Sequence, residues 1–292
     1  MRIVSLLPSA TEIVCALGLE ESLVAVTHEC DYPPTVRGKP VLTASVVAPT
    51  SSGEIDRHIR GLVHQGSSIY RLDAERLVSL QPDLILTQEL CEVCAVSYPI
   101  VQNAARRLDG PLKLVSLEPQ SLGDVFDNIR LVGQLTGEEA VAVTVIDQLS
   151  ARVAEVSRQV AARPARPVVC LEWIDPPFNS GHWTPGLVAL AGGNDVLGSG
   201  SRPASALSWE SINAVEAGVV VVMACGLSLD RSLDEADALR SRFAGRELWV
   251  VDGNAYFSRP GPRLVDSLEI MAGILHPEMV PGPGPELARR IA

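Results

Sequence analysis

Basic residues are scarce in this sequence. Its 292 residues include 35 aspartates and glutamates but only 24 lysines and arginines, which gives a formal net charge of −11. No segment gathers lysine and arginine into a patch. Because nucleic acids and anionic membrane surfaces attract clustered positive charge, neither is an expected partner.

Long apolar runs are also lacking. The chain starts MRIVSLLPSATEIV, and Pro8 ends the first apolar run before it reaches the length of a secretory signal. No run approaches the ~20 apolar residues of a transmembrane helix. We therefore expect a cytoplasmic protein with no transmembrane segment. Its six cysteines would then stay reduced and would not form a disulfide framework.

Sequence motifs of catalysis are missing as well. The segment GSGSRP at 198–203 does not match the phosphate-binding loop, and no G-x-G-x-x-G follows the first apolar run. Neither a G-x-S-x-G elbow nor an H-E-x-x-H helix is present. The sequence therefore favours a protein that is not an enzyme.

What the chain does contain is a regular alternation of short apolar runs and amphipathic helical patterns. Such alternation predicts an α/β fold with central parallel sheets. Ser9 and Glu12 predict a capping box that starts a helix at Ala10, and Thr184 predicts the N-cap of a later helix. The predicted strands lie at 2–7, 22–27, 82–88, 111–117, 167–173, 219–224 and 247–252. The predicted helices between and after them include 54–65, 73–80, 97–108, 230–242 and 261–275.

Residues 119–163 interrupt this alternation with apolar positions at helical spacing, which predict one long helix bent near Gly137. The pattern therefore predicts two Rossmann-like α/β lobes, at 1–118 and 164–280, joined by this interlobe helix. The proline- and glycine-rich tail at 281–292 is expected to be loosely held.

Unusual side chains collect where the predicted strands end. In open parallel sheets, ligands bind beyond the carboxyl ends of the strands. If the two lobes face each other, these loops line one cleft. The candidate ligand-binding residues are Ser9, Tyr32, Glu172, Trp173, Phe178, His182, Trp183, Asp252, Tyr256, Arg259 and Arg263.

Different roles are expected within this set. Aromatic residues are only 4% of the chain, so their presence in these loops could mark flat walls for a ring-shaped ligand, although core packing is the alternative. Arg259 and Arg263 could hydrogen-bond ligand amides or carboxylates. Glu172 could be a polar contact or a metal ligand. Ser9 and Thr184, as caps, would aim two helix N-termini at the cleft, which favours a negatively charged ligand group.

Cysteine and histidine form a second candidate site. Cys91 and Cys94 have C-x-x-C spacing, and His28 and Cys30 follow another predicted strand, so the four could hold zinc, iron or cobalt. Three alternatives are a redox pair, packing as small apolar residues, and direct contact with a metal chelate, for example His28 approaching the metal of a corrinoid. We expect the other cysteines, which are Cys15, Cys170 and Cys225, to lie in the core.

Three segments, in order, carry a resemblance that spans nearly the whole chain. RIVSLLPSATEIVCALGLEESLVAV, LDAERLVSLQPDLILT and YFSRPGPRLVDSLEIMAGIL resemble the helical-backbone substrate-binding proteins of ABC importers. The PSATE and SRPGPR segments are similar to those of the cobalamin-binding branch.

This resemblance implies two α/β lobes bridged by a stiff helix, with cobalamin or a related metal chelate bound between them without catalysis. It also implies an ABC importer as a partner. Two alternatives stay open. One is a cytosolic metal-binding protein that uses the Cys/His site, and the other is an enzyme that uses the cleft for corrinoid or thiol chemistry.

Overall fold

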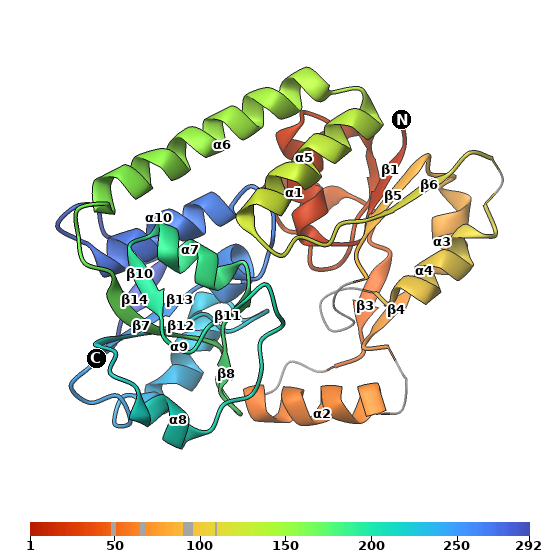
Figure 1. The fold of residues 1–292 in the computed structure, drawn as a ribbon. Helices are drawn as coiled ribbons and strands as arrows, with labels where there is room; N and C mark the ends of the chain where they lie inside the picture. The colour runs from red at the N-terminus through yellow and green to blue at the C-terminus, as the bar shows by residue number, and fades with distance from the viewer. Residues whose placement is uncertain (48–50, 65–67, 90–95, 109) are drawn as a thin grey trace. The chain divides into compact units, whose positions relative to one another are not determined.

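The computed structural model describes residues 1–47, 51–64, 68–89, 96–108 and 110–292 (Figure 1). The chain forms two compact units. Unit 1 holds residues 1–50, 54–118 and 126–146, and unit 2 holds 51–53, 119–125 and 147–292. Each unit has its own parallel sheet, which confirms the predicted α/β class.

The sheet of unit 1 has four parallel strands in the order β2-β1-β5-β6. Their bounds are Leu23–Ala25, Ile3–Ser5, Leu84–Thr87 and Lys113–Ser116. The two central strands are mostly apolar and buried throughout, as expected for a sheet covered by helices. One face packs on α3 (Ala74–Ser79) and α4 (Tyr98–Ala105) through Leu77 and Val101. All four strands lie inside the predicted ranges.

Helix α1 (Pro8–Ala16) follows β1 directly, but not through the predicted capping box. Leu7 is the N-cap and no side chain caps the helix. Ser9 is buried inside the first turn, 4% exposed. Proline suits the first helical position because its φ is already helical and its missing N–H has no partner to lose. Gly18, at φ +75°, ends the helix as predicted.

A short antiparallel pair, β3 (Thr43–Ser45) and β4 (Tyr70–Leu72), was not predicted. Figure 1 shows the two strands side by side in unit 1. The remaining described elements before β6 are η1 (Glu20–Ser22), η2 (Pro34–Gly38) and α2 (Ser52–His64).

The predicted single helix over 119–163 is two helices, α5 (Leu122–Thr136) and α6 (Glu139–Val160). Gly137 lies between them at φ +81°, a conformation that ends helices and favours glycine. The two helices approach closely here, since a Cβ on Gly133 would lie 2.6 Å from the Cβ of Ala142. The chain therefore turns at Gly137, and both α5 and the longer α6 have residues in each of the two units.

The main sheet of unit 2 has the order β10-β7-β12-β13-β14, and only the pairing of β14 in that series is antiparallel. The five strands span Gly193–Asp195, Arg166–Trp173, Val219–Val222, Glu247–Val251 and Ala288–Arg290. One face packs on α8 (Trp209–Ala214) and α9 (Leu229–Ala236). The smaller elements are β8 (Phe178–Asn179), β9 (Gly181–His182), β11 (Ser199–Gly200), η3 (Asp237–Leu239) and the π-helical turn η4 (Gly253–Phe257).

Two helices of unit 2, α7 (Thr184–Leu190) and α10 (Leu264–Leu275), pack on each other. Thr184 is not the N-cap of α7 as predicted, because Trp183 holds that position. The Thr184 hydroxyl donates instead to Glu172 Oε1 at 3.1 Å. A hydrogen bond to Glu172 of β7 therefore takes the place of the cap that Thr184 was predicted to make.

The expectation of a loosely held tail is wrong. Residues 288–290 form β14 and pair with β13, and the Ile291 N–H donates to the Leu248 carbonyl at 2.8 Å. Ala288 is 3% exposed. The tail therefore extends the sheet by one strand, and β14 becomes its edge. Among the helices of the described ranges, none combines the length and the apolar character needed to span a bilayer.

Candidate ligand-binding edges of the two sheets

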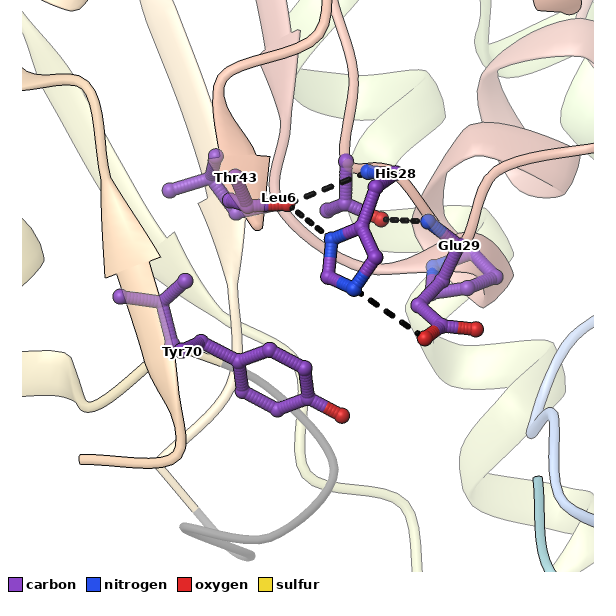
Figure 2. Close-up of a pocket in the computed structure, with 8 residues that line it drawn as sticks. Leu6, His28, Glu29, Thr43 and Tyr70 are labelled. Atoms are coloured by element: carbon purple, nitrogen blue, oxygen red, sulfur yellow. Dashed lines mark hydrogen bonds and ion pairs between the residues drawn. The ribbon is translucent and has the colours of Figure 1, made fainter. Parts of the chain in front are cut away.

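A small pocket lies at the carboxyl edge of the unit 1 sheet (Figure 2). It is formed where β1 and β2 end, with β3 and β4 as a further wall. This is the position at which parallel sheets bind ligands. The described residues that line it are Leu6, Pro8, Thr27, His28, Glu29, Thr43, Tyr70 and Val96.

A turn that begins at Thr27 brings His28 and Glu29 into this pocket. The Thr27 hydroxyl accepts a hydrogen bond from the Glu29 N–H at 3.0 Å, and the Thr27 carbonyl accepts one from the Cys30 N–H at 3.2 Å. Threonine hydroxyls favour such turns because they hydrogen-bond to backbone two residues on.

His28 is fixed from two sides. Its backbone N–H donates to Thr43 Oγ1 at 3.1 Å, and its Nδ1 lies 2.7 Å from the same oxygen. On the other side of the ring, Nε2 lies 3.2 Å from Glu29 Oε1. Figure 2 shows the imidazole between Thr43 and Glu29, with the Tyr70 ring beside it. The two rings are 5.5 Å apart between centroids and tilted by 54°.

Cys30 belongs to a different environment. Its thiol is buried, 7% exposed, and lies 3.0 Å from Thr11 Oγ1. Thr11 in turn donates to Ser5 Oγ at 2.8 Å. Cys30 is not among the described residues that line the pocket. The sulfur therefore joins a buried hydroxyl network behind the pocket.

The predicted four-residue metal site stays a prediction. Cys91 and Cys94 lie in the segment 90–95, outside the described residues. In the part of the chain that the structure describes, no three histidine, cysteine, aspartate or glutamate side chains are grouped as a metal site requires.

In unit 2, Glu172 at the end of β7 organises the carboxyl edge. Its Oε1 accepts hydrogen bonds from the Gly181 N–H at 2.9 Å and from the Thr184 hydroxyl at 3.1 Å. Burial raises the pKa of Glu172 from 4.5 to about 8 and outweighs these two hydrogen bonds, which lower it. Glu172 is therefore largely protonated at neutral pH.

A second carboxyl group lies close by. Burial also raises the pKa of Asp195, although a hydrogen bond from the Ser180 hydroxyl opposes the shift. Glu172 and Asp195 therefore hold the segment 180–184 from two different strands.

This segment presents two stacked rings, those of His182 and Trp183. Their centroids are 5.4 Å apart and their planes differ by 25°. His182 has φ +50°, and its N–H donates to the Arg202 carbonyl at 2.7 Å. The Trp183 indole N–H donates to the Phe257 carbonyl at 2.9 Å. Burial lowers the pKa of His182, so its ring is neutral at neutral pH.

The end of β13 contributes a polar turn. The Asp252 carboxylate accepts a hydrogen bond from the Ala255 N–H at 2.7 Å and so caps η4. The Arg263 guanidinium lies over the Tyr256 ring, 5.4 Å from its centroid. Arg259, only 4% exposed, is buried in the following turn. The contacts described for Asp252 and Arg263 are thus made within this turn and the start of α10.

The other predicted site residues are more scattered. Tyr32 is exposed, 44%, beyond the turn at Thr27. Trp173 packs against the core of unit 2, and Phe178 pairs opposite it in β8. Both of these aromatics therefore have a structural role. Of the remaining predictions, the core placement is confirmed for Cys170 but is wrong for Cys225, which is exposed just after β12.

Of the polar and aromatic residues that line the pocket, Thr27, Glu29, Thr43 and Tyr70 were missed by the analysis of the sequence. Glu29 stood in the right loop but was not singled out. Thr43 and Tyr70 were missed because the β3 and β4 pair was not predicted. The usable signal was the short β-branched and aromatic runs VLTASVV and SIYRL.

The described side chains at the two edges can hydrogen-bond, stack on a flat ring and offer the imidazoles of His28 and His182, which is the chemistry of binding. Residues 3–249 match the model of the family described as "Periplasmic binding protein". The vitamin B12-binding protein of Vibrio cholerae is 23% identical over 284 residues, which cover 92% of this chain and 86% of that protein. A cobalamin-binding protein of Halobacterium salinarum is 25% identical over 94% of this chain and 69% of its own length.

Solved structures share the fold. The periplasmic vitamin B12-binding protein of Vibrio cholerae matches with a TM-score of 0.69 at 21% identity and covers 94% of this chain and 96% of its own. A periplasmic heme-binding protein of Pseudomonas aeruginosa matches with a TM-score of 0.72 at 21% identity over 100% and 98% of the two chains. Because the family match spans most of the sequence, the chain belongs to the periplasmic binding protein family, as its resemblance to importer-binding proteins indicated.

Proposed function

We propose that this protein binds a corrinoid, with cobalamin as its ligand, without transforming it. The observation that carries the proposal is the similarity, over nearly the full length, to proteins that are named for binding vitamin B12 or cobalamin. The proposed contacts are the loops at the carboxyl ends of the two sheets.

The chemistry of these loops supports a corrinoid. Cobalamin has a broad ring system with neutral amide side chains. The stacked rings of His182 and Trp183 offer a flat surface on which a corrin ring can stack. Because Glu172 is largely protonated at neutral pH, it places little negative charge at the end of β7.

Haem is the competing chelate, because proteins named for binding haem share the fold. Haem carries two carboxylates, which proteins usually neutralise with arginine or lysine. The described lining of the unit 1 pocket contains Glu29 but no arginine or lysine. This favours the neutral amides of a corrinoid at that edge.

Titration distinguishes the two chelates. Purified protein is titrated with cyanocobalamin and, separately, with hemin, and binding is followed by calorimetry and absorbance. We expect one cyanocobalamin per chain and a weaker response to hemin. Tight binding of hemin with no response to cyanocobalamin would replace the corrinoid by haem.

A variant at the proposed ring surface adds a second test. Trp183→Leu should weaken cyanocobalamin binding, since stacking area is lost. Trp249→Leu, in the middle of β13, is the matched control and should leave the affinity unchanged if both variants stay folded. Equal affinities of the two variants would remove Trp183 from the site.

The metal-binding alternative needs its own measurement. Elemental analysis of protein purified without added metal should find less than one zinc or iron ion per chain if the corrinoid proposal is right. A full equivalent of metal that Cys91→Ser abolishes would favour the alternative. An ABC importer as partner and a cytoplasmic location stay predictions.

A further inference from the structure

We infer that His28 is a nitrogen donor to the metal of the bound chelate, with Thr43 as the residue that positions it. This inference rests on the proposed function, since it assigns a role in binding cobalamin to one side chain of the unit 1 pocket. A His28–cobalt bond would be formed in addition to the stacking proposed above.

The first observation is the way Thr43 holds the histidine. One hydroxyl oxygen lies 3.1 Å from the backbone nitrogen of His28 and 2.7 Å from its Nδ1. Two contacts to one atom fix both the backbone and the ring plane. Histidines that bind metals through Nε2 are held in this way by a partner on Nδ1, which sets the tautomer and the direction of the ring.

The second observation is the contact at Nε2. Nε2 and Glu29 Oε1 are 3.2 Å apart. Two lone pairs do not approach favourably at this distance, so a proton bridges them when no metal is present. Figure 2 shows this nitrogen on the side of the ring away from Thr43, in the pocket. Of the two ring nitrogens, Nε2 is thus the one that faces the pocket.

The bond change is a ligand exchange. Aquacobalamin has a water on one face of its cobalt. The proton between Nε2 and Glu29 leaves for solvent while Nδ1 takes one up, and the Nε2 lone pair then forms a bond to cobalt as the water leaves. The imidazole proton then resides on Nδ1 and is donated to Thr43 Oγ1. No oxidation or reduction is involved, and imidazole nitrogen is a common ligand of such metals.

The neighbouring groups are poorer donors. The Cys30 thiol is buried next to the Thr11 hydroxyl and does not line the described pocket. Tyr70 lies beside the imidazole with its ring tilted, which makes it a wall of the pocket. His28, whose side chain is 25% exposed, is both held and accessible.

The test compares two forms of cobalamin. In cyanocobalamin, cyanide occupies the face from which aquacobalamin loses water, so only aquacobalamin can take the new ligand. Wild-type protein should shift the absorbance bands of aquacobalamin to those of its imidazole complex. It should bind aquacobalamin at least about tenfold more tightly than cyanocobalamin, a difference of about 1.4 kcal/mol.

Variants assign the effect to residues. His28→Ala should still bind cyanocobalamin but lose both the band shift and the tenfold preference. Thr43→Val keeps the shape of the side chain without its hydroxyl and should reduce the preference while the shift persists. His58→Ala, on the exposed face of α2, is the matched control and should behave as wild type. If His28→Ala does not fold, His28→Gln is measured in its place.

The outcomes separate the two proposals. If wild-type protein binds both cobalamins without a band shift, or if the shift survives in His28→Ala, the role of His28 is wrong while corrinoid binding stands. If neither cobalamin binds, both proposals are wrong.

Discussion

Single residues decide how the edge of the unit 2 sheet is built. Gly181 is one of them, since a Cβ at this position would lie 2.5 Å from the Ala204 nitrogen and 2.6 Å from the Arg202 oxygen. Both atoms belong to backbone and cannot turn away. The absence of a side chain therefore lets the strand carrying His182 pack against the segment 202–204.

Replacing Gly181 tests this close approach. Gly181→Ala should lower the free energy of unfolding by about 1–3 kcal/mol, because the backbone must shift to admit a methyl group. Urea unfolding measures the change. Gly186→Ala is the control, because Gly186 lies exposed in α7 with no atom within 4 Å of an added Cβ. It should be neutral or slightly stabilising, and equal losses in both variants would contradict the argument.

Glu172 predicts a dependence of stability on pH. Its pKa is about 8 in the folded protein against 4.5 for an unburied carboxyl group, so the folded state keeps a proton that the unfolded chain has released. The contribution of Glu172 to stability is thus fully present below pH ~4.5 and falls as pH rises toward 8. Glu172→Gln cannot ionise and keeps an oxygen acceptor for Gly181 and Thr184.

The measurement is urea unfolding of wild type and Glu172→Gln between pH 5 and 9. The variant should gain stability relative to wild type as pH rises, by on the order of 2–4 kcal/mol across the window. Glu216→Gln, at an exposed position after α8, should show no such gain. A constant difference between Glu172→Gln and wild type at all pH values would show that Glu172 does not titrate in this range.

At the scale of elements, α6 is held to α10 by one arginine within unit 2. Arg152 donates to Glu269 through Nε at 2.9 Å and through a terminal nitrogen at 2.7 Å, and to Asp266 at 2.5 Å. The two acidic residues lie one turn apart on α10, so a single planar guanidinium reaches both. This ion pair network fixes α6 on a buried helix of unit 2.

Arg152→Met should lower the free energy of unfolding by about 1 kcal/mol, a small value because the arginine side chain is 40% exposed and solvent screens the pairs. The loss should shrink in 1 M salt. Arg158→Met is the control, because Arg158 pairs only with Glu155 of its own helix among the contacts described and both are exposed. A loss that salt does not change would indicate packing of the arginine stem instead of charge.

At the scale of the whole molecule, ligand binding should increase the free energy of unfolding. A ligand that binds only the folded chain stabilises it by about 2.7 kcal/mol at a free concentration 100 times Kd. Cyanocobalamin should therefore raise the unfolding midpoint in a concentration-dependent way, measured by circular dichroism. Adenosine, which lacks the corrin ring, should leave the midpoint unchanged. An unchanged midpoint with saturating cyanocobalamin would contradict corrinoid binding.

Much of the fold could be predicted because the spacing of apolar residues along the chain indicates its strands and helices. The strands β1, β5 and β12 are short runs of apolar residues, and helices such as α10 repeat every three or four residues. The carboxyl ends of the strands follow from these positions, so His28, Glu172 and His182 were placed at strand ends from the sequence. Local pattern did not foresee β3 and β4, which are three residues each.

Caps and turns were predicted less well, because competing partners decide them. Ser9 and Thr184 have the right side chains for helix caps, yet one is buried in a helix and the other bonds to Glu172. Gly137 was predicted to bend a helix and instead ends one. For Thr184, a contact with another element outweighed the local preference, whereas Pro8 and Gly137 followed local preferences that the analysis of the sequence had not used.

The sequence by itself determined the α/β class, the order of the strands along the chain, the acidic surface and the family, since these depend on composition and local pattern. Only the tertiary structure decided that Thr43 and Tyr70 meet His28, that Cys30 turns to Thr11, and that the pKa of Glu172 rises. These depend on contacts between segments far apart in the chain and on burial, which no local pattern contains.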